Sequence, residues 1–444
     1  MKKRSRKSVE MTLPEALAYA VKLHQDRDLK GAEELYRLIL KARPSHPDAL
    51  HYLGVVSHQL GKGPESAELI RRAIELQPGY ADAYNNLGNV LKEQGMLAEA
   101  ERMYRKVIEL RPESAEAYNN LGVALKEQQR FQEALEAYRQ AIALNPAHAD
   151  AWHNMGNILK KQGNLEDALT AYRQAILLKP RHADAYKNMG RALYAARRVK
   201  EAVEVYQQWL KQDPDNPVAQ HMLAASSGEA VPERASDEYV QQVFDKFSGS
   251  FDEVLKGLEY RAPQLIAEAV EQTLGAPTAT LDVIDAGCGT GLCGPHLKQY
   301  AGHLVGVDLS PGMLAKASGR GVYDDLVYSE LTAFLSSRHA ACDLIVSADT
   351  LCYFGTLDAV LRAAAGALRG DGRLMFTVEH ASQEDAPKGF RIHPHGRYSH
   401  TERYVRDMVG QAGLSLTSIR EEVLRKEGDK PVAGLVVVAH KPDD

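Results

Sequence analysis

The N-terminal half of the chain repeats one pattern of small, aromatic and proline positions. Proline recurs every 34 residues from Pro44 to Pro214, and glycine recurs in the same phase from Gly54 to Gly190. An aromatic residue stands four positions before each later glycine. The second half of most repeats carries a small residue and then, further along, a tyrosine. This spacing predicts pairs of amphipathic helices. Proline ends the second helix because it lacks an N–H group and clashes with the preceding turn.

One helix pair cannot bury its own apolar face, so successive pairs must stack into a solenoid. We expect the small residues to let two helices approach closely, and the aromatic rings to fill the space between one pair and the next. The pattern divides the chain into four parts. These are a basic tail at 1–11, six repeats with a capping helix at 12–225, a linker at 226–236 and a second domain at 237–442.

The repeat pattern resembles the tetratricopeptide repeat family over about residues 12–215. The resemblance implies a concave groove that binds an extended peptide or a partner protein. An amide side chain both donates and accepts, so a ladder of asparagines can pair with a peptide backbone. Such a ladder resembles the one that lines the repeats of O-GlcNAc transferase, although the asparagines can instead tie adjacent helices together. One asparagine stands in register in each of four repeats, at Asn86, Asn120, Asn154 and Asn188.

From Leu281 onward, short apolar runs alternate with helical patterns. This alternation predicts a doubly wound, Rossmann-like α/β sheet of parallel strands after the all-α solenoid. The ligand of such a sheet lies beyond the carboxyl ends of the strands. We expect strands at 281–286, 303–308, 343–348, 373–379 and 434–440, and helices at 357–368 and 400–411.

The first of these strands runs into the sequence Asp285-Ala-Gly287-Cys-Gly289-Thr-Gly291. Glycine lets the backbone turn sharply and approach a ligand. Asp308 ends the second strand, where a carboxylate can accept hydrogen bonds from both ribose hydroxyls of an adenosine. The charge of Asp285 suits a cationic ligand better than a pyrophosphate. A dinucleotide fingerprint, G-x-G-x-x-G, also begins at Gly289. An NAD(P) enzyme needs this fingerprint at the tip of the first strand, whereas here it begins beyond that tip.

This set of motifs resembles the class I, seven-stranded methyltransferases over roughly residues 237–442. The resemblance implies S-adenosyl-L-methionine as cofactor. Gly370 and Asp371 depart from the family's turn before the fifth strand, where a proline and a glycine are usual. The cofactor-binding residues that the resemblance implies are Asp285, Gly287, Gly289, Gly291, Asp308, Leu309, Met313, Glu330, Leu331 and Ala348.

A segment rich in histidine, from His393 to His400, follows the fifth strand on the ligand side. Methyl transfer needs an aligned nucleophile, and a hydroxyl or amine nucleophile also needs a base. We expect the base among His395, His400 and Asp349. Arg397 and Tyr398 are candidates for binding the substrate, with Arg397 anchoring an anionic group. The alternative is that these are ordinary residues of a surface loop. No metal is expected, because the histidines lack carboxylates at ligand spacing.

Composition narrows the possible functions. A net charge of −5 gives no reason to expect a nucleic-acid partner, and no apolar run is long enough to span a membrane. The spacing of the four cysteines predicts no disulfide framework, so we expect a cytoplasmic protein. The leading hypothesis is that the repeats capture a polypeptide and the second domain methylates it. The alternatives are a small-molecule or carrier-bound acid as substrate, with the repeats used for assembly, and a scaffold with an inactive methyltransferase fold.

Overall fold

A computed structural model describes residues 11–428 and 430–443. Nearly all of the basic tail expected at 1–11 therefore lies outside the described residues. Contacts within the chain separate two compact units, one ending at Ala192 and the other beginning at Leu193.

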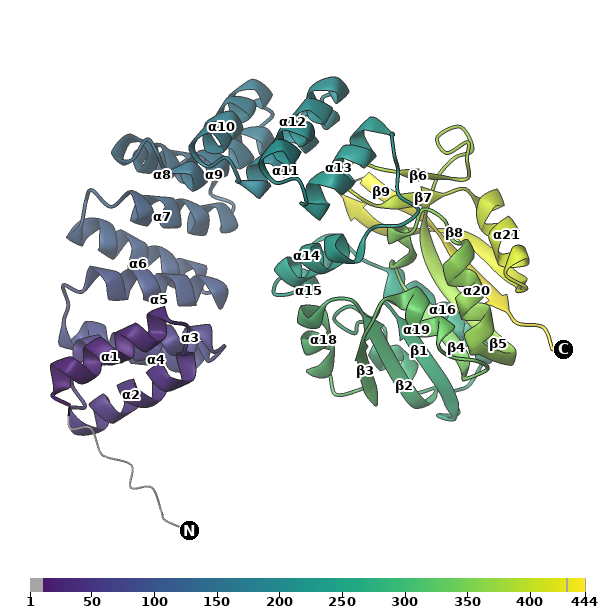
Figure 1. Cartoon of the computed structure of the whole chain (residues 1–444), viewed down its shortest axis with the longest axis horizontal. Coiled ribbons are helices and arrows are strands. Elements are labelled where there is room, and N and C mark those ends of the chain that lie inside the picture. The colour runs from purple at the N-terminus through teal and green to yellow at the C-terminus, as the bar shows by residue number, and fades with distance from the viewer. Residues whose placement is uncertain (1–10, 429, 444) are drawn as a thin grey trace, which may run out of the picture. The chain divides into compact units, whose positions relative to one another are not determined.

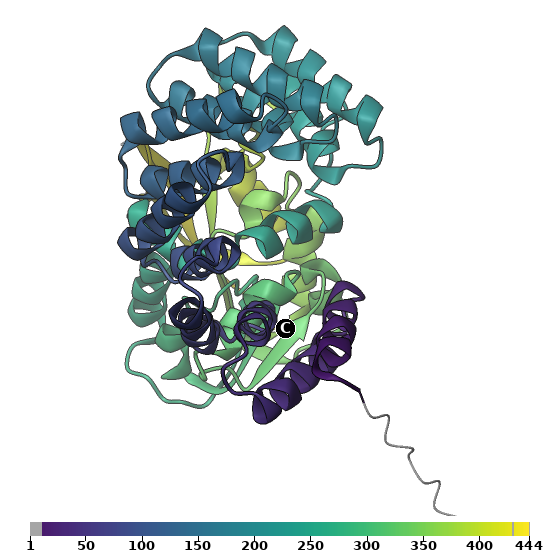
Figure 2. The same ribbon diagram turned by 90° about the vertical axis from the view of Figure 1, so that its left-hand side faces the viewer.

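In the described part of the chain, residues 13–212 form six helix pairs, as the 34-residue period predicted (Figure 1). Figure 2 shows the pairs of the first unit stacked one after another. The second helix of each pair ends two residues before the recurring proline. The helices are α1 (Leu13–Gln25), α2 (Leu29–Ala42), α3 (Pro47–Gln59), α4 (Gly63–Leu76), α5 (Ala81–Glu93), α6 (Leu97–Leu110), α7 (Ala115–Glu127), α8 (Phe131–Leu144), α9 (Ala149–Lys161), α10 (Leu165–Leu178), α11 (Ala183–Ala195) and α12 (Val199–Gln212).

The recurring glycines fit against a side chain of their own helix pair. A Cβ atom on Gly88 would lie 2.6 Å from the ring of Tyr104, and one on Gly122 would lie 2.5 Å from the ring of Tyr138. These tyrosines thus pack within a pair, whereas Tyr84, which precedes Gly88, packs in a cluster with Ala117 of the next pair, as the prediction of aromatic rings between pairs requires. The packing within a pair arises because a helix without a Cβ at this point leaves a slot into which the ring of the facing helix fits.

Replacing Gly122 with alanine is expected to lower the free energy of unfolding by about 1–3 kcal/mol, because the new methyl group overlaps Tyr138. Urea denaturation followed by circular dichroism measures the change. The control is Gly410→Ala, in a helix where no atom lies within 4 Å of the new Cβ. The free energy of unfolding of that variant should rise by about 0.5–1 kcal/mol, because alanine is more favourable than glycine within a helix. Equal effects of the two substitutions would contradict the close packing.

The second unit contains a nine-stranded sheet. Strands β3, β2, β1, β4 and β5 lie side by side and parallel (Figure 1), and β9 continues the sheet beyond β5 with β8 at its edge. A short hairpin, β6–β7, pairs with the end of β5. The strands are β1 (Leu281–Ala286), β2 (Ala301–Asp308), β3 (Asp325–Tyr328), β4 (Cys342–Ser347), β5 (Leu368–His380), β6 (Phe390–Ile392), β7 (Tyr398–His400), β8 (Ser415–Glu427) and β9 (Lys430–His440).

The α/β fold class is confirmed, but the expectation of a wholly parallel sheet is wrong at one edge. Strand β9 runs antiparallel to both β5 and β8. The physical reason is that two residues join β8 to β9, and so short a connection allows only an antiparallel pair. The helix expected from His400 begins later, as α21 (Glu402–Gln411), because His400 ends β7.

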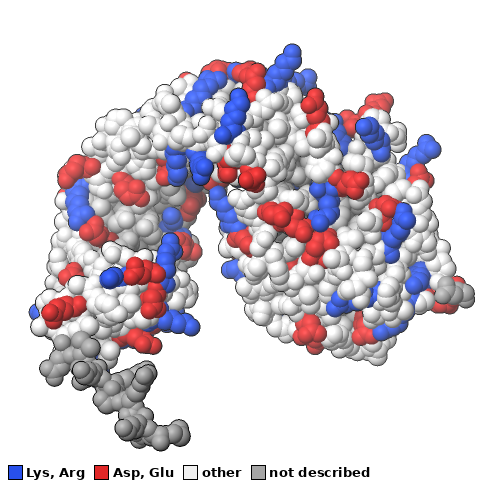
Figure 3. Space-filling model, viewed as in Figure 1, with Lys and Arg blue, Asp and Glu red and all other residues white. Residues whose placement is uncertain are grey.

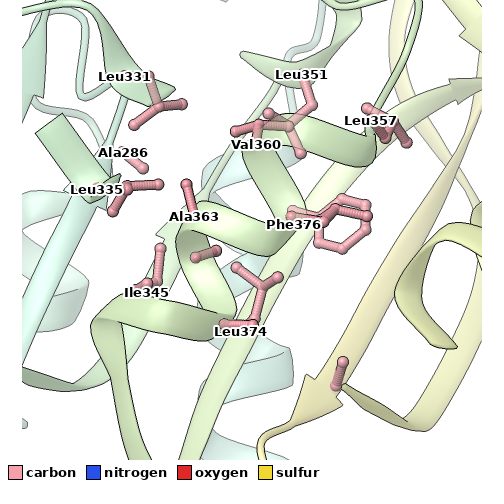
Figure 4. Close-up of a cluster of buried hydrophobic side chains, with 14 of the residues drawn as sticks. Ala286, Leu331, Leu335, Ile345, Leu351, Leu357, Val360, Ala363, Leu374 and Phe376 are labelled. Atoms are coloured by element: carbon pink, nitrogen blue, oxygen red, sulfur yellow. The ribbon is translucent and has the colours of Figure 1, made fainter. Parts of the chain in front are cut away.

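Two apolar clusters hold helices against the two faces of the sheet. One face packs against α19 (Leu331–Ser336), α20 (Asp358–Ala367) and α21 (Figure 4). The other packs against α16 (Ala262–Leu274) and α17 (Gly294–Lys298). The carboxyl ends of the parallel strands remain at one edge, together with α14 (Asp237–Phe247), α15 (Phe251–Gly257), α18 (Pro311–Ser318) and the turn η1 (Leu351–Tyr353).

The capping helix predicted at the end of the repeats forms as α13 (Pro217–Ser227) and belongs to the second unit. Its His221 ring stacks on Tyr239 of α14 with the ring centroids 3.9 Å apart. The segment that follows α13, expected to be a linker, also packs against this unit. Backbone hydrogen bonds join Ala235 N–H to the carbonyl of Tyr353 (2.8 Å) and Gly355 N–H to that of Glu233 (2.8 Å).

Candidate functional site

The glycine-rich loop after β1 adopts the backbone conformation that its glycines favour. The φ angles of Gly287, Gly289 and Gly291 are +75°, +54° and +82°. A Cβ on Gly287 would also lie 2.3 Å from Thr350, so two constraints act on that position. At Gly289 no atom lies within 4 Å of where a Cβ would stand. The loop therefore presents bare backbone to open space at Gly289.

Asp308, at the end of β2, braces this loop. Its Oδ2 accepts a hydrogen bond from Gly289 N–H at 2.9 Å, and its Oδ1 accepts one from Ser310 N–H at 2.8 Å. Burial raises the pKa of Asp308, and the backbone donors partly offset that effect. Each carboxylate oxygen keeps a further lone pair for a ligand hydroxyl. The same carboxylate can thus shape the loop and bind a ligand.

Asp285 lies behind the loop, with 1% of its surface exposed. Its Oδ2 accepts a hydrogen bond from the hydroxyl of Tyr323 at 2.6 Å. Burial raises the pKa of Asp285 to about 7, with Tyr323 lowering it and the nearby charge of Asp308 raising it. Two carboxylates therefore lie close together beside the loop, and a cation bound there would favour ionisation of both.

Helices α14 and α15 are tied to the loop region by two aspartates. Asp252 accepts hydrogen bonds from the hydroxyl of Thr290 (2.5 Å) and from Arg320 (2.6 Å). Asp245 accepts one from the hydroxyl of Ser310 (2.5 Å), which caps α18. The two helices, which we call the lid, are thus attached beside Gly289, through Thr290, and beside Asp308, through Ser310.

A buried cluster of charged side chains lies at the carboxyl end of β5. Arg425 of β8, with 3% of its side chain exposed, bonds to Asp349 (2.8 Å), Glu427 (2.8 Å) and Glu379. Arg397 bonds to Glu379 (2.5 Å) and also to Glu427. Burial raises the pKa of Glu379, but Arg397 and Arg425 outweigh it and hold the pKa at about 2. We call these five residues the ionic cluster.

Asp349 connects the ionic cluster to the glycine loop. Its backbone has a φ of +56°, which is strained for a residue other than glycine. The next residue, Thr350, donates a hydrogen bond to the carbonyl of Gly287 at 3.1 Å. The Oδ2 of Asp349 pairs with Arg425, whereas its Oδ1 is buried and has no hydrogen-bond partner among the described residues. A buried acceptor without a donor is costly, so a ligand that supplies one is favoured there.

Comparisons with known proteins agree with this geometry. A family model described as a methyltransferase domain matches residues 284–376, which run from the glycine loop into β5. Models of the tetratricopeptide repeat match residues 45–113, 81–147, 125–173 and 153–217. The chain consists of tetratricopeptide repeats followed by a methyltransferase domain.

The methyltransferase domain is similar to parts of several curated proteins. Human methyltransferase-like protein 27 is 37% identical over 84 residues, which cover 19% of this chain and 34% of that protein. Bovine 18S rRNA (guanine-N(7))-methyltransferase is 36% identical over 73 residues, covering 16% and 26%. The bifunctional biotin biosynthesis protein BioHC of Saccharophagus degradans is 25% identical over 180 residues, covering 37% and 31%. The chain thus spans about a third or less of each relative.

The tetratricopeptide repeats are similar to solved repeat proteins. The pilus biogenesis factor PilW is 19% identical, with 48% of this chain and 100% of PilW covered and a TM-score of 0.44. YrrB, described as having an unusual peptide-binding site, is 23% identical, with 42% and 96% covered and a TM-score of 0.34.

The remaining cofactor residues implied for the methyltransferase domain take up different positions. Glu330 caps α19, where its two oxygens accept hydrogen bonds from the N–H groups of Thr332 (3.0 Å) and Ala333 (2.7 Å). Leu331 and Met313 are buried, while Leu309 and Ala348 are partly exposed. A role for Glu330 in cofactor binding must therefore coexist with helix capping.

Two predicted substrate residues of the methyltransferase domain are engaged inside the protein. The guanidinium of Arg397 pairs with two carboxylates of the ionic cluster, so its expected role as an anchor for an anionic substrate stays a prediction that must coexist with these pairs. Tyr398 is fully buried and its hydroxyl donates to the carbonyl of Pro232 at 2.8 Å. Both lie in or beside β7, a strand that the sequence pattern did not indicate.

The two histidines proposed as bases are poorly placed to accept a proton. His400 is fully buried, and its Nε2 must donate to the carbonyl of Gly355 at 3.1 Å. The Nδ1 of His395 accepts from Arg397 N–H at 3.3 Å, which leaves the proton of the neutral ring on Nε2. Burial lowers the pKa of His400 to about 4 and that of His395 to about 3.

The asparagine ladder of the repeats is engaged within the fold. Each amide nitrogen contacts a side chain of the preceding repeat, and binding of a peptide by the ladder stays a prediction. These contacts connect adjacent helices, which is the alternative interpretation of the ladder. They are Asn86 with His51 (2.8 Å), Asn120 with Asn85 (3.1 Å), Asn154 with Asn119 (3.1 Å) and Asn188 with Asn157 (2.9 Å).

Sequence reasoning missed Arg425, Glu379 and the two lid aspartates. Arg425 carries no signal in a linear pattern, because a register shift between Val423 and Arg425 interrupts the strand's alternation. Glu379 could have been noticed as a charge that ends an otherwise apolar strand at the ligand edge.

The surface of the protein gives two further observations. On the face drawn in Figure 3, positive and negative side chains are interspersed. Within the described ranges, no helix combines the length and apolarity needed to cross a membrane. The expected absence of a nucleic-acid partner stays a prediction.

Proposed function

We propose that this protein is an S-adenosylmethionine-dependent methyltransferase that acts on a polypeptide held by its repeats. The observation that carries the proposal is the position of α13. This last helix of the repeat array lies within the compact unit of the methyltransferase domain. The Nε2–H group of its His221 donates a hydrogen bond to the carbonyl of Gly396 (2.8 Å), and the ring stacks on the lid residue Tyr239.

A contact of this kind favours joint action of the repeats and the domain. His221 is 4% exposed, and burial lowers the pKa of its ring, so it acts as a neutral donor. It touches both the lid and the segment that carries Arg397. A partner that shifts α13 would therefore move groups on either side of the site. Repeats used only for assembly would not need this attachment.

The residues present fit S-adenosylmethionine. The open space beside Gly289 admits a ligand to the backbone, Asp308 has lone pairs for ribose hydroxyls, and Asp285 can balance an ammonium group. When bound, the cofactor supplies a methyl group already activated by the sulfonium. The chain's own residues then have to orient the acceptor and exclude water.

Among the three predicted bases, Asp349 has the best geometry. Its Oδ1 is the buried acceptor without a partner, and Arg425 holds the other oxygen in place. Burial raises the pKa of Asp349, although Arg425 works against that rise. We assign Asp349 to accept a hydrogen bond, and where needed the proton, from an N–H or O–H nucleophile.

The direct test supplies purified full-length protein and methyl-labelled S-adenosylmethionine to a cell extract. Label in protein is expected, and Asp308→Ala should remove it. Label confined to small molecules would overturn the polypeptide proposal and favour a small-molecule or carrier-bound acid. No transfer to any fraction would leave the inactive scaffold as the better hypothesis.

Cofactor affinity is expected to fall below pH 7. The Asp285 carboxyl is protonated below its pKa of about 7, and a cationic ligand binds the ionised form, so binding at lower pH must first remove a proton. Affinity should therefore weaken by about tenfold per pH unit below 7 and level off above it. Calorimetric titration from pH 5.5 to 8.5 measures this dependence.

Two variants test the assignment of the titration to Asp285. Asp285→Asn should flatten the profile. Tyr323→Phe should move the midpoint to higher pH, because it removes a hydrogen bond that lowers the pKa of Asp285. An unchanged midpoint in both would show that another group titrates.

A further inference from the structure

A cavity lies away from the glycine loop, on the face of the sheet that α16 covers. Its volume is about 490 Å³, within the range of small-molecule sites. Its walls come from α16, the start of β5, and strands β8 and β9. None of its lining residues belongs to the glycine loop, the lid or the ionic cluster.

Two arginines from different strands line this cavity. Arg373 on β5 pairs in register with His440, and Arg420 on β8 pairs with Val436. Paired residues of antiparallel strands project to the same face, and alternate residues of β9 share that face. Val436 packs in the apolar cluster of α16, so Arg373 and Arg420 both project toward α16.

Neither arginine has a carboxylate partner in the part of the chain that the structure describes. The nearby acids of β8 are engaged elsewhere, with Glu421 bonded to His380 (2.9 Å) and Glu422 beside Arg261 (3.9 Å). By contrast, Arg369 at the start of β5 pairs with two aspartates. Two guanidinium groups that line one cavity make it favourable for an anion.

Neutral hydrogen-bonding groups complete the walls. Gln272 and Thr273 lie on α16, and Thr417 and Ser418 lie on β8. The hydroxyl of Thr417 contacts Nδ1 of His440 at 3.1 Å. Asp371 is the single acid among the residues that line the cavity. The cavity thus offers two positive charges against one negative charge, several polar groups and more room than a bare anion fills.

We propose that this cavity binds a small phosphate ester, with Arg373 and Arg420 on the phosphate and the polar side chains around the rest of the molecule. Guanidinium groups match the several acceptor oxygens of a phosphate. The volume leaves space for a body of roughly sugar size. This inference does not depend on the proposed methyltransferase reaction.

The test titrates ribose 5-phosphate into the full-length protein by calorimetry at constant ionic strength, with inorganic phosphate and ribose as comparison ligands. Ribose 5-phosphate is expected to bind one-to-one and more tightly than either comparison ligand. Arg373→Gln and Arg420→Gln should each weaken binding by about tenfold or more. Arg362→Gln is the control, because that arginine is paired on the surface of α20.

Asp371→Asn is a second variant, and it should tighten binding because it removes the one negative charge of the wall. Misfolding cannot produce such a gain in affinity. No saturable binding of ribose 5-phosphate to the wild type would overturn the proposal. So would equal affinities in the wild type and both arginine variants. Binding of inorganic phosphate as tight as that of the ester would overturn the assignment to an ester.

Discussion

Replacing Arg425 with methionine is expected to lower the free energy of unfolding of the second unit by about 3–5 kcal/mol. Arg425 is 3% exposed and bonds to Asp349, Glu379 and Glu427. The substitution leaves the largely buried carboxylates of Asp349 and Glu379, and the partly exposed one of Glu427, with only Arg397 to balance them. Their mutual repulsion and their lost hydrogen bonds both act against the folded state.

Tryptophan fluorescence can follow the urea denaturation of this unit alone. The chain has two tryptophans, and Trp209 is buried in α12 of the second unit. In a Trp152→Phe background, its fluorescence reports the unfolding of that unit. Arg362→Met is the matched control, since it breaks an exposed pair with Asp358 and should change the free energy by less than about 1 kcal/mol. Similar losses in the two variants would contradict a buried ionic cluster.

The Arg425→Met variant should also lose methyl transfer beyond what its stability explains. Arg425 holds one oxygen of Asp349 and so directs the other. At a temperature where the variant is still folded, the maximal rate should fall more than the affinity for the cofactor. An unchanged maximal rate would show that Asp349 does not take part in the reaction.

The second large effect is expected from Asp308→Ala, which should weaken S-adenosylmethionine binding by about 1.5–3 kcal/mol, or roughly tenfold to 150-fold. The carboxylate is expected to bind the ribose hydroxyls and also holds Gly289 and Ser310. Calorimetry on the full-length protein measures the affinity. Asp325→Ala on the neighbouring strand β3 is the control, because Asp325 is exposed and pairs with His303.

Asp308→Asn separates the two roles of this side chain. Its amide oxygen can still accept one backbone hydrogen bond, while the charge and one acceptor are lost. We expect it to restore much of the stability lost in Asp308→Ala but little of the cofactor affinity. Wild-type affinity in Asp308→Ala would remove this residue from the cofactor site.

Local features of the fold could be predicted because they depend on neighbouring residues. The recurring proline and glycine positions set the helix pairs, since each acts through its own backbone. The order of strands and helices around Asp285 and Asp308 likewise placed both carboxylates at the ligand edge. The partner of each recurring glycine was not predicted, because the slot beside Gly122 is filled by Tyr138 of the facing helix.

The amino-acid sequence by itself determined the repeat array, the glycine loop and the two acids beside it. The tertiary structure alone decided that Arg397 is neutralised, that His400 is sealed in the core and that Arg425 reaches Asp349 across 76 positions of the chain. The physical reason is that a periodic pattern records which face of an element is buried. It does not record which charged groups from distant elements meet there, and only those meetings fix the charge and the hydrogen-bonding capacity of each side chain.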